Sequence, residues 1–325
     1  MDLVAAVLGL AILLGAGDAL VRGAVALSLR LGIPALLVSL TVVAFGTSAP
    51  ELLISVQAAL DDAPGIAFGN VVGSNIANVL LVLGVPAVIS AIDARDCDSR
   101  RNYAMMLGAS AVFAALCFFG PLGWPQGLLL LALLTLVLWD AYRAARAHRM
   151  GAGCAAAVED DDLPEEIADA DPNMPTWKLV AFLAVGLIGL PAGAHLLIEG
   201  ARGIALAMGV SEAAIGLTLV ALGTSLPELA TTVMAAMRKQ ADVALGNVIG
   251  SNIFNILAIM GVASFFGPLE VPPGMLEIDL WVMLASALVI WPFICGKMVI
   301  GRLAGGAMIA VYVGYVAFAL TGGPV

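Results

Sequence analysis

Two short stretches of this chain decide how it is interpreted. Residues 42–56 read VVAFGTSAPELLISV, and a close copy, LVALGTSLPELATTV, occupies residues 219–233. Each stretch places a proline followed by a glutamate, Glu51 or Glu228, inside an otherwise apolar run. A proline removes a hydrogen bond from a helix, and a carboxylate is costly in an apolar medium. The recurrence of both together therefore indicates a shared role.

Composition identifies the medium. The chain has 325 residues, of which 62% are hydrophobic and 12% charged, whereas soluble domains carry about 25% charged residues. Apolar runs of roughly 20 residues recur from end to end, long enough to cross about 30 Å of hydrocarbon. The runs are continuous rather than alternating, which favours helices over a barrel. We therefore predict an all-α polytopic membrane protein. The first run, residues 3–20, has no basic segment before it and no clear cleavage site, so we expect it to remain as a membrane helix.

About ten transmembrane helices are predicted, five on each side of an acidic segment. The expected spans are residues 3–29, 35–60, 66–92, 103–120, 124–143, 176–207, 212–237, 242–267, 276–295 and 303–320. Residues 1–143 then form a first five-helix repeat, residues 144–175 an acidic linker, and residues 176–325 a second repeat. The linker holds much of the acidic excess behind the net charge of −10, and it is expected to be a solvated segment. A weak cation-sensing role for the linker is the alternative.

The two halves are related by duplication. A shift of 177 residues overlays residues 41–84 on residues 218–261 without a gap, with 23 of 44 positions identical. The matches include Gly, Thr, Ser, Pro, Glu and Asn, which shared apolar composition does not explain. Because each half has an odd number of helices, the second copy must enter the membrane from the opposite side. Inverted repeats with broken helices at the midplane are typical of secondary transporters.

Basic residues predict the orientation, because Lys and Arg concentrate in cytoplasmic loops. If the N-terminus lies outside, the inner loops hold nearly all of them: Arg30, Arg95, Arg100, Arg101, Arg143, Arg146, Arg149, Lys178, Arg238, Lys239, Lys297 and Arg302. We therefore expect both termini outside and the linker 144–175 inside.

Each copy of the motif gathers oxygen atoms within about one helical turn. Pro50 leaves the carbonyl of Gly46 without its helical donor, and Pro227 does the same to Gly223. The two glycines are expected to loosen the backbone there. Hydroxyl groups adjoin both breaks, on Thr47, Ser48, Thr224 and Ser225. Such backbone survives in a membrane only where it lines a cavity or site, and this cluster of oxygens suits a hard cation.

The following helix supplies a matching polar face. Residues 69–78 read GNVVGSNIAN and residues 246–255 read GNVIGSNIFN. In each copy an asparagine, a serine and a second asparagine recur at i, i+4 spacing: Asn70, Ser74 and Asn78, then Asn247, Ser251 and Asn255. The glycine pairs in the same stretches allow another helix to approach closely. Structural packing without ion binding is the alternative for either copy alone.

Charge and ligand count favour calcium. Calcium takes about 6–8 oxygen ligands. Glu51 and Glu228 offer two carboxylates, whose charge matches one divalent cation, and Asn78, Asn255 and freed carbonyls supply further oxygens. Without a divalent ion the two close carboxylates repel, so the site should attract protons or sodium. Competition for the same carboxylates is a physical basis for exchange.

The first predicted helix carries two charged residues, Asp18 and Arg22. They stand at i, i+4, a spacing suited to an ion pair. We expect a structural or interfacial role, with a gating contribution as the alternative.

The motifs GTSAPE with GNVVGSNIAN, and GTSLPE with GNVIGSNIFN, resemble the α-repeats of the sodium/calcium exchanger branch of the cation/calcium antiporters. The resemblance covers both repeats, and the ten-helix layout fits the rest of the chain. It implies that Glu51 and Glu228 are the principal calcium ligands and that backbone oxygens of Thr47 and Thr224 complete that site. It further assigns Asn78 and Asn255 to a central site, and to flanking sodium sites Ser48, Ser74, Ser225, Ser251 and the carbonyls of Ala44 and Ala221.

The resemblance implies a secondary antiporter of a bacterial inner membrane that exports Ca²⁺ in exchange for Na⁺ by alternating access, in which the first and sixth helices slide. Some potassium-using relatives carry aspartate where this chain has Asn255, which argues against potassium dependence. A Ca²⁺/H⁺ antiporter is the alternative, and a cation channel is less favoured. The chain lacks HExxH, GxSxG and Walker-type motifs, so we expect no enzyme activity and no cofactor. No nucleic acid or obligate protein partner is expected.

Overall fold

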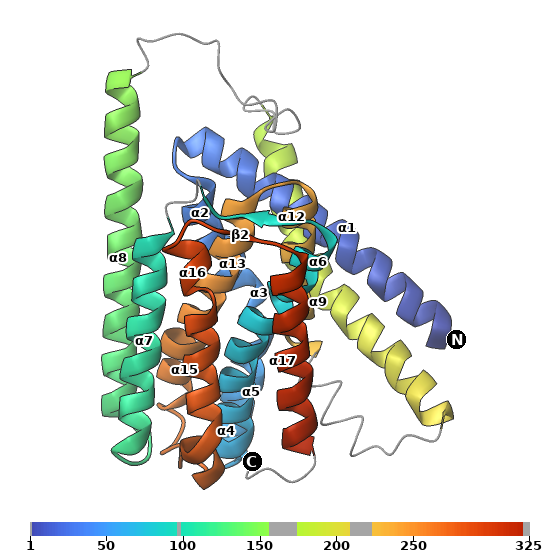
Figure 1. The fold of residues 1–325 in the computed structure, drawn as a ribbon, viewed down its shortest axis with the longest axis vertical. Helices are drawn as coiled ribbons and strands as arrows, with labels where there is room; N and C mark the ends of the chain where they lie inside the picture. Colours follow the sequence, from blue (N-terminus) through green and yellow to red (C-terminus); the bar gives the residue numbers. More distant parts are fainter. Residues whose placement is uncertain (1, 96–98, 156–173, 209–222, 321–325) are drawn as a thin grey trace.

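Helices make up almost the whole molecule (Figure 1). The computed structural model describes residues 2–95, 99–155, 174–208 and 223–320. In these ranges eight helices are long and apolar enough to cross a membrane, or nine if one bent pair is a single span. The predicted all-α polytopic fold is confirmed. The strands among the described residues are β1 (Ile92–Asp93) and β2 (Val299–Ile300), which pair antiparallel at one end of the bundle.

The first half begins with one long helix and continues with helices that are interrupted at polar sequences. In chain order its elements are α1 (Asp2–Leu31), α2 (Ala35–Val38), η1 (Ser39–Val43), α3 (Ala44–Thr47), α4 (Ala49–Leu60), α5 (Pro64–Ala77), η2 (Asn78–Val82), α6 (Gly84–Ile89), α7 (Arg100–Phe118) and α8 (Trp124–Ala155), where η marks a π-helical turn. The break at Ser48 and the π-helical turn that begins at Asn78 fall at residues that the sequence identified as candidate ligands.

The second half repeats this order in its described part. Its elements are α9 (Thr176–Ala207), α12 (Leu226–Met237), α13 (Ala241–Phe254), η5 (Asn255–Ile259), α14 (Met260–Ala263), η6 (Met275–Asp279), α15 (Leu280–Val289), α16 (Trp291–Ile294) and α17 (Arg302–Leu320). The helices α4 and α12, α5 and α13, and the turns η2 and η5 begin and end at positions related by the same shift of 177 residues. The duplication seen in the sequence is therefore a structural repeat.

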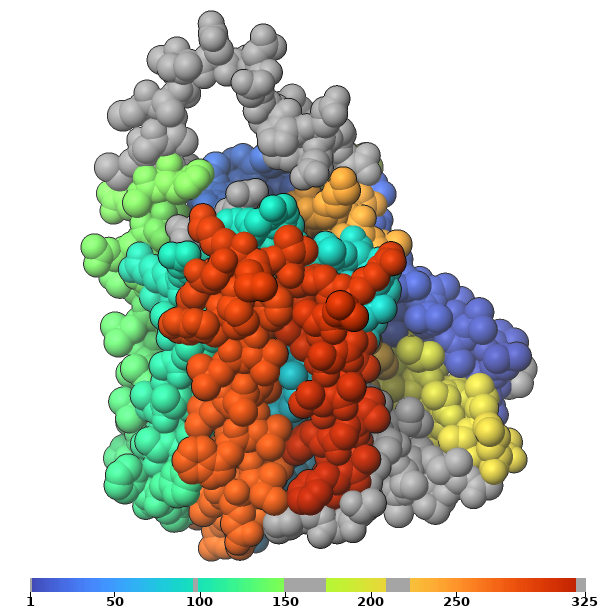
Figure 2. All heavy atoms as spheres, viewed as in Figure 1, coloured from blue at the N-terminus to red at the C-terminus, as the bar shows by residue number. Residues whose placement is uncertain are grey.

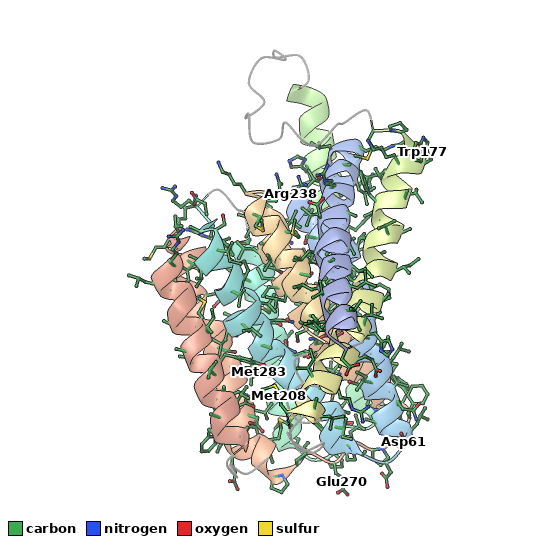
Figure 3. All side chains as sticks on the ribbon, turned by 90° about the vertical axis from the view of Figure 1, so that its right-hand side faces the viewer. Asp61, Trp177, Met208, Arg238, Glu270 and Met283 are labelled. Carbon is green, nitrogen blue, oxygen red and sulfur yellow. The ribbon has the colours of Figure 1, made fainter. Side chains whose placement is uncertain are left out.

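The two repeats point in opposite directions. Asp61 and Arg238 are equivalent residues under the 177 shift, and Figure 3 shows them at opposite ends of the molecule. Two short backbone pairings between the halves also lie at opposite ends of the molecule. Ile92 pairs with Ile300 at one end, and Leu122 pairs with Leu269, next to Glu270, at the other. The predicted inverted arrangement is thus what the chain adopts.

The helices α1 and α9 form an antiparallel pair that stands apart from the rest of the bundle at its far ends (Figures 1 and 2). Glycines let the two backbones touch. A Cβ atom added to Gly9 would lie 2.4 Å from the backbone nitrogen of Leu197, and one added to Gly200 would lie 2.4 Å from that of Ala6. No side chain fits between the backbones at these positions, so the pair is held by close contact of small residues.

The helix α13 lies at the centre, and nearly all residues of the span Ala241–Ala263 to which it belongs are buried inside the protein. Figure 2 shows α15, α16 and α17 covering one face of the bundle. A Cβ atom on Gly250 would lie 2.5 Å from the carbonyl oxygen of Leu40, and Ser39 Oγ donates to the carbonyl of Val243 at 2.7 Å. The close approach predicted for this glycine pair is therefore made against α2 and η1, which belong to the other repeat.

The end of the fifth predicted span differs clearly from the structure. The fifth span was predicted to end at residue 143, but α8 continues to Ala155 because residues 144–155 are rich in alanine and arginine, which favour helix. The rest of the acidic run, residues 156–173, lies outside the described residues. Of the predicted span 212–237, the structure describes the part from Gly223 onward.

Candidate cation-binding site

The break in each motif explains how proline and glutamate coexist in a membrane helix. The segment Ala35–Thr47, which ends with α3, meets α4 at Ser48 with a bend of 46°, and Ser48 has φ −84° and ψ 4°. The equivalent Ser225 has φ −85° and ψ 2° before α12. Each proline therefore falls in the first turn of a new helix, where its missing N–H has no partner to lose. Each glutamate lies in the same first turn, at the helix end that favours negative charge.

The two glycines act differently from the sequence prediction. Gly46 was expected to loosen the backbone, but it lies within α3 and lacks a positive φ. A Cβ atom on Gly46 would lie 2.0 Å from Leu187 Cδ2, and one on Gly223 would lie 2.4 Å from Ile198 Cδ1. Both contacting side chains belong to α9. The glycines make room for α9 to lie directly over the two breaks.

The two glutamates meet in the interior. Glu51 and Glu228 are 1% and 0% exposed. Ser48 Oγ, at the break just before Glu51, donates to Glu228 Oε1 at 3.4 Å. That hydrogen bond joins one repeat to the other across 180 positions of sequence. The inverted symmetry thus gathers both carboxylates at one place.

Amide side chains brace the two breaks in the same way. Asn70 Nδ2 donates to the carbonyl of Glu51 at 3.0 Å and to Ser55 Oγ at 2.9 Å. In the second repeat, Asn247 Nδ2 donates to the carbonyl of Glu228 at 3.3 Å and to Thr232 Oγ1 at 3.0 Å. Their N–H groups therefore hold the first turns that carry the glutamates.

Several buried polar atoms around the carboxylates have no hydrogen-bond partner within the described ranges. They are Glu51 Oε1 and Oε2, Glu228 Oε2, Asn78 Oδ1, Thr224 Oγ1, Ser225 Oγ, and Asn255 Oδ1 and Nδ2. Buried polar groups are normally paired, and each unpaired one costs about 1–3 kcal/mol. All but one of these atoms are oxygens, and they come from both repeats. Their chemistry fits a hard cation, for which such oxygens are ligands.

The other predicted site residues are also buried where the structure describes them. Thr47 Oγ1 lies 3.3 Å from the carbonyl oxygen of Ala44 and 3.5 Å from Ser251 Oγ. The Ala44 carbonyl also accepts from the backbone N–H of Ser48 at 3.0 Å, so it already has two donors. Ser74 is 3% exposed. Ala221 lies outside the described residues.

The sequence interpretation did not single out Asn75 and Asn252, the asparagines of the two GSN triplets. Asn252 is 2% exposed, and its Oδ1 accepts from Asn78 Nδ2 at 3.0 Å. A signal was available, because these two asparagines are equivalent under the 177 shift and both lie in apolar helices. Their spacing of three residues from Asn78 and Asn255 also places them near the same helix face.

Comparison with known proteins agrees with this geometry. The sequence pattern of the sodium/calcium exchanger protein family matches residues 1–142 and 178–321. Inner membrane protein YrbG of Escherichia coli is 35% identical over 292 residues, covering 90% of this chain and 87% of that protein. Sodium/calcium exchanger MaX1 of Methanosarcina acetivorans is 32% identical, covering 95% of each.

A solved structure is also similar over nearly the whole chain. The sodium-calcium exchanger NCX_Mj, soaked with 2.5 mM Na⁺ and 0.1 mM Ca²⁺, superposes with a TM-score of 0.80 at 32% identity, covering 97% of each chain. The resemblance inferred from the two motifs is confirmed. Together with the inverted pair of carboxylate-bearing breaks, these matches show that the chain belongs to the sodium/calcium exchanger family of membrane transport proteins.

Proposed function

We propose that this chain is a secondary antiporter that exports Ca²⁺ in exchange for entering Na⁺. It works by alternating access in a bacterial inner membrane. Both termini lie outside and the linker 144–175 lies in the cytoplasm. Glu51 and Glu228 clasp the calcium ion, and the surrounding hydroxyl, amide and carbonyl oxygens complete its shell or hold sodium. Because both ions use the same carboxylates, the occupancy of one excludes the other.

The observation that carries this proposal is the set of unpartnered buried oxygens on the two broken helices. A structural role would pair these groups with each other or with the backbone, as the amide nitrogens of Asn70 and Asn247 are paired. The atoms left over are oxygens with a total of two negative charges when both carboxylates are ionised. That is the complement of one divalent cation or of two monovalent cations.

Exchange also needs a driving force. One elementary charge that crosses 100 mV gains about 2.3 kcal/mol. Export of one calcium ion is therefore assisted by the membrane potential when more positive charge enters than leaves. No nucleotide is required by this scheme.

The experiment is sodium-driven calcium flux in proteoliposomes. Glu51→Gln and Glu228→Gln each remove one charge from the site without changing its shape, and each should abolish the flux. Glu277→Gln makes the same chemical change at an exposed position and should leave flux near the wild-type value. Near-normal flux in either site variant would refute the assignment of that glutamate.

The alternatives have their own signatures in the same vesicles. Calcium uptake driven by a pH gradient without sodium would favour a Ca²⁺/H⁺ antiporter. Calcium flux that needs no counter-ion gradient would favour a channel. Imposing sodium, potassium and proton gradients separately distinguishes these cases and tests the expectation that potassium is not required.

A further inference from the structure

The duplication carries a second pair of buried polar side chains beside the proposed ligands. Asn75 and Asn252 are equivalent under the 177 shift, and so are Met106 on α7 and Met283 on α15. Figure 3 labels Met283 inside the bundle. All four side chains are buried, with exposed fractions of 2% or less. None of the four is one of the proposed ligands. The two sets make different contacts, although their sequences are equivalent.

In one set the side chains form a continuous chain of hydrogen bonds. Asn78 Nδ2 donates to Asn252 Oδ1 at 3.0 Å, and Asn252 Nδ2 donates to Met106 Sδ at 3.6 Å. Asn78 Oδ1, at the far end of this chain, has no partner within the described residues. This series of hydrogen bonds therefore ends at the unpaired side-chain oxygen of Asn78, which is a proposed cation ligand.

The methionine decides the direction of the chain. A thioether sulfur accepts hydrogen bonds and donates none. Met106 therefore favours the orientation of Asn252 that turns its NH₂ group toward the sulfur and its oxygen toward Asn78. Asn78 must then present its own NH₂ group to Asn252, because two facing amide oxygens would repel. The oxygen of Asn78 is left on the other side, where a cation needs a negative dipole.

Within the described part of the protein, the equivalent residues Asn255, Asn75 and Met283 do not form this series of hydrogen bonds. Asn75 Nδ2 donates instead to the carbonyl of Val71 in its own helix at 2.7 Å. Asn75 Oδ1 and both polar atoms of the Asn255 amide have no partner there. The amide of Asn255 is therefore not held in one orientation by Asn75. The two repeats are equivalent in sequence but not in how they present their amides.

We propose that Asn252, oriented by Met106, is a positioning residue that fixes the amide of Asn78 with its oxygen toward the transported cation. The inference rests on the proposed function, because it names how one ligand of that site is oriented. A fixed amide binds without the entropic cost of choosing its orientation on each binding event. Asn78 is thus a preset ligand, while Asn255 adjusts its amide when the ion arrives.

The test uses the internal symmetry as its control. Asn252→Leu removes the acceptor for Asn78, whereas Asn75→Leu makes the same change at the equivalent position, where only an intrahelical contact is lost. Calcium affinity is measured by calorimetry on purified protein, and the half-saturating calcium concentration by flux. Asn252→Leu should weaken calcium binding by about twofold to tenfold, the range set by one ordinary hydrogen bond, with the maximal rate unchanged. Asn75→Leu should leave affinity within about twofold of the wild type.

Two further comparisons exclude a merely structural effect. Met106→Leu should weaken calcium binding in the same direction and Met283→Leu should not, which keeps the inference testable if Asn252→Leu fails to fold. In an Asn78→Asp background both terminal atoms are oxygens, so the loss caused by Asn252→Leu should shrink, whereas damage to packing would persist. Equal affinities for Asn252→Leu and Asn75→Leu would overturn the inference while leaving the antiporter proposal intact. Normal calcium binding without sodium-driven flux would overturn the antiporter proposal. The comparison of calcium affinities between Asn252→Leu and Asn75→Leu would still test whether Asn252 positions Asn78.

Discussion

Replacing Gly9 with alanine should separate the two long helices that lie across the site. An added Cβ atom would lie 2.4 Å from the backbone nitrogen of Leu197 and 2.8 Å from the carbonyl oxygen of Gly193, and ordinary contact begins at 3.4 Å. The 2.4 Å position must therefore open by about 1 Å, the difference between 3.4 and 2.4 Å. Because the obstructing atoms are backbone, no side chain can turn away, and α1 or α9 must move as a whole.

The expected cost follows from a matched variant on the same helix. Overpacking of this kind typically costs about 1–3 kcal/mol, while an alanine in a helix gains about 0.5–1 kcal/mol over glycine. Gly15 also lies in α1, is exposed, and has no neighbour within 4 Å among the described residues, so Gly15→Ala keeps the gain without the clash. Because both variants gain the same helix stability from alanine, that gain cancels in their comparison. Gly9→Ala should therefore be less stable than Gly15→Ala by about 1–3 kcal/mol, which is the cost of overpacking.

The assay is thermal unfolding of the purified protein in detergent, with both variants measured beside the wild type. The melting temperature of Gly9→Ala should fall by several degrees, and that of Gly15→Ala should stay level or rise slightly. Sodium-driven flux measured on the same preparations shows whether the wider spacing also impairs transport. Equal melting temperatures for the two variants would refute the close backbone contact between α1 and α9.

Three further predictions use the same preparations. Calcium at one hundred times its Kd should stabilise the wild type by about 2.7 kcal/mol, and Glu51→Gln should lose this effect; an undiminished shift in that variant would contradict its role as a ligand. Asp18→Asn breaks two ion pairs: Asp18 Oδ1 with Arg238 Nη2 at 2.5 Å, which joins α1 to the end of α12, and the predicted pair of Asp18 Oδ2 with Arg22 Nε at 2.9 Å. Because both pairs are partly exposed, the loss should be about 1 kcal/mol or less for each pair and should shrink in high choline chloride; a loss independent of salt would count against an electrostatic origin. Tyr315→Phe removes the hydroxyl that donates to Asp279 Oδ1 at 2.8 Å and should cost about 1–3 kcal/mol in thermal unfolding, and an unchanged melting temperature would show that the buried carboxyl does not need this donor.

Much of the fold was predictable from the sequence because its signals are local or periodic. Continuous apolar runs fixed the medium and the helical class, and the constant offset of 177 residues exposed the duplication. An odd number of helices in each half required the second copy to be inverted. The candidate ligands could also be named in advance, because polar residues such as Glu51 and Glu228 are costly in an apolar helix unless they have a function.

Other features depended on contacts between residues far apart in the chain. The sequence suggested that Gly46 loosens its helix, whereas the structure shows that it makes room for Leu187 of α9. Asn75 and Asn252 look alike in sequence, yet only Asn252 contacts an asparagine of the other repeat among the described residues. A motif states which oxygens are present but not which way an amide turns.

The sequence by itself therefore determined the medium, the helices, the inverted duplication and the set of candidate oxygens, because composition and spacing act within one helix or at a fixed repeat. Only the tertiary structure decided that both carboxylates meet, that α9 lies over both breaks and that the two repeats present their asparagines differently. These are properties of packing between helices that are distant in sequence, and near-identical motifs acquire different neighbours once the chain has folded.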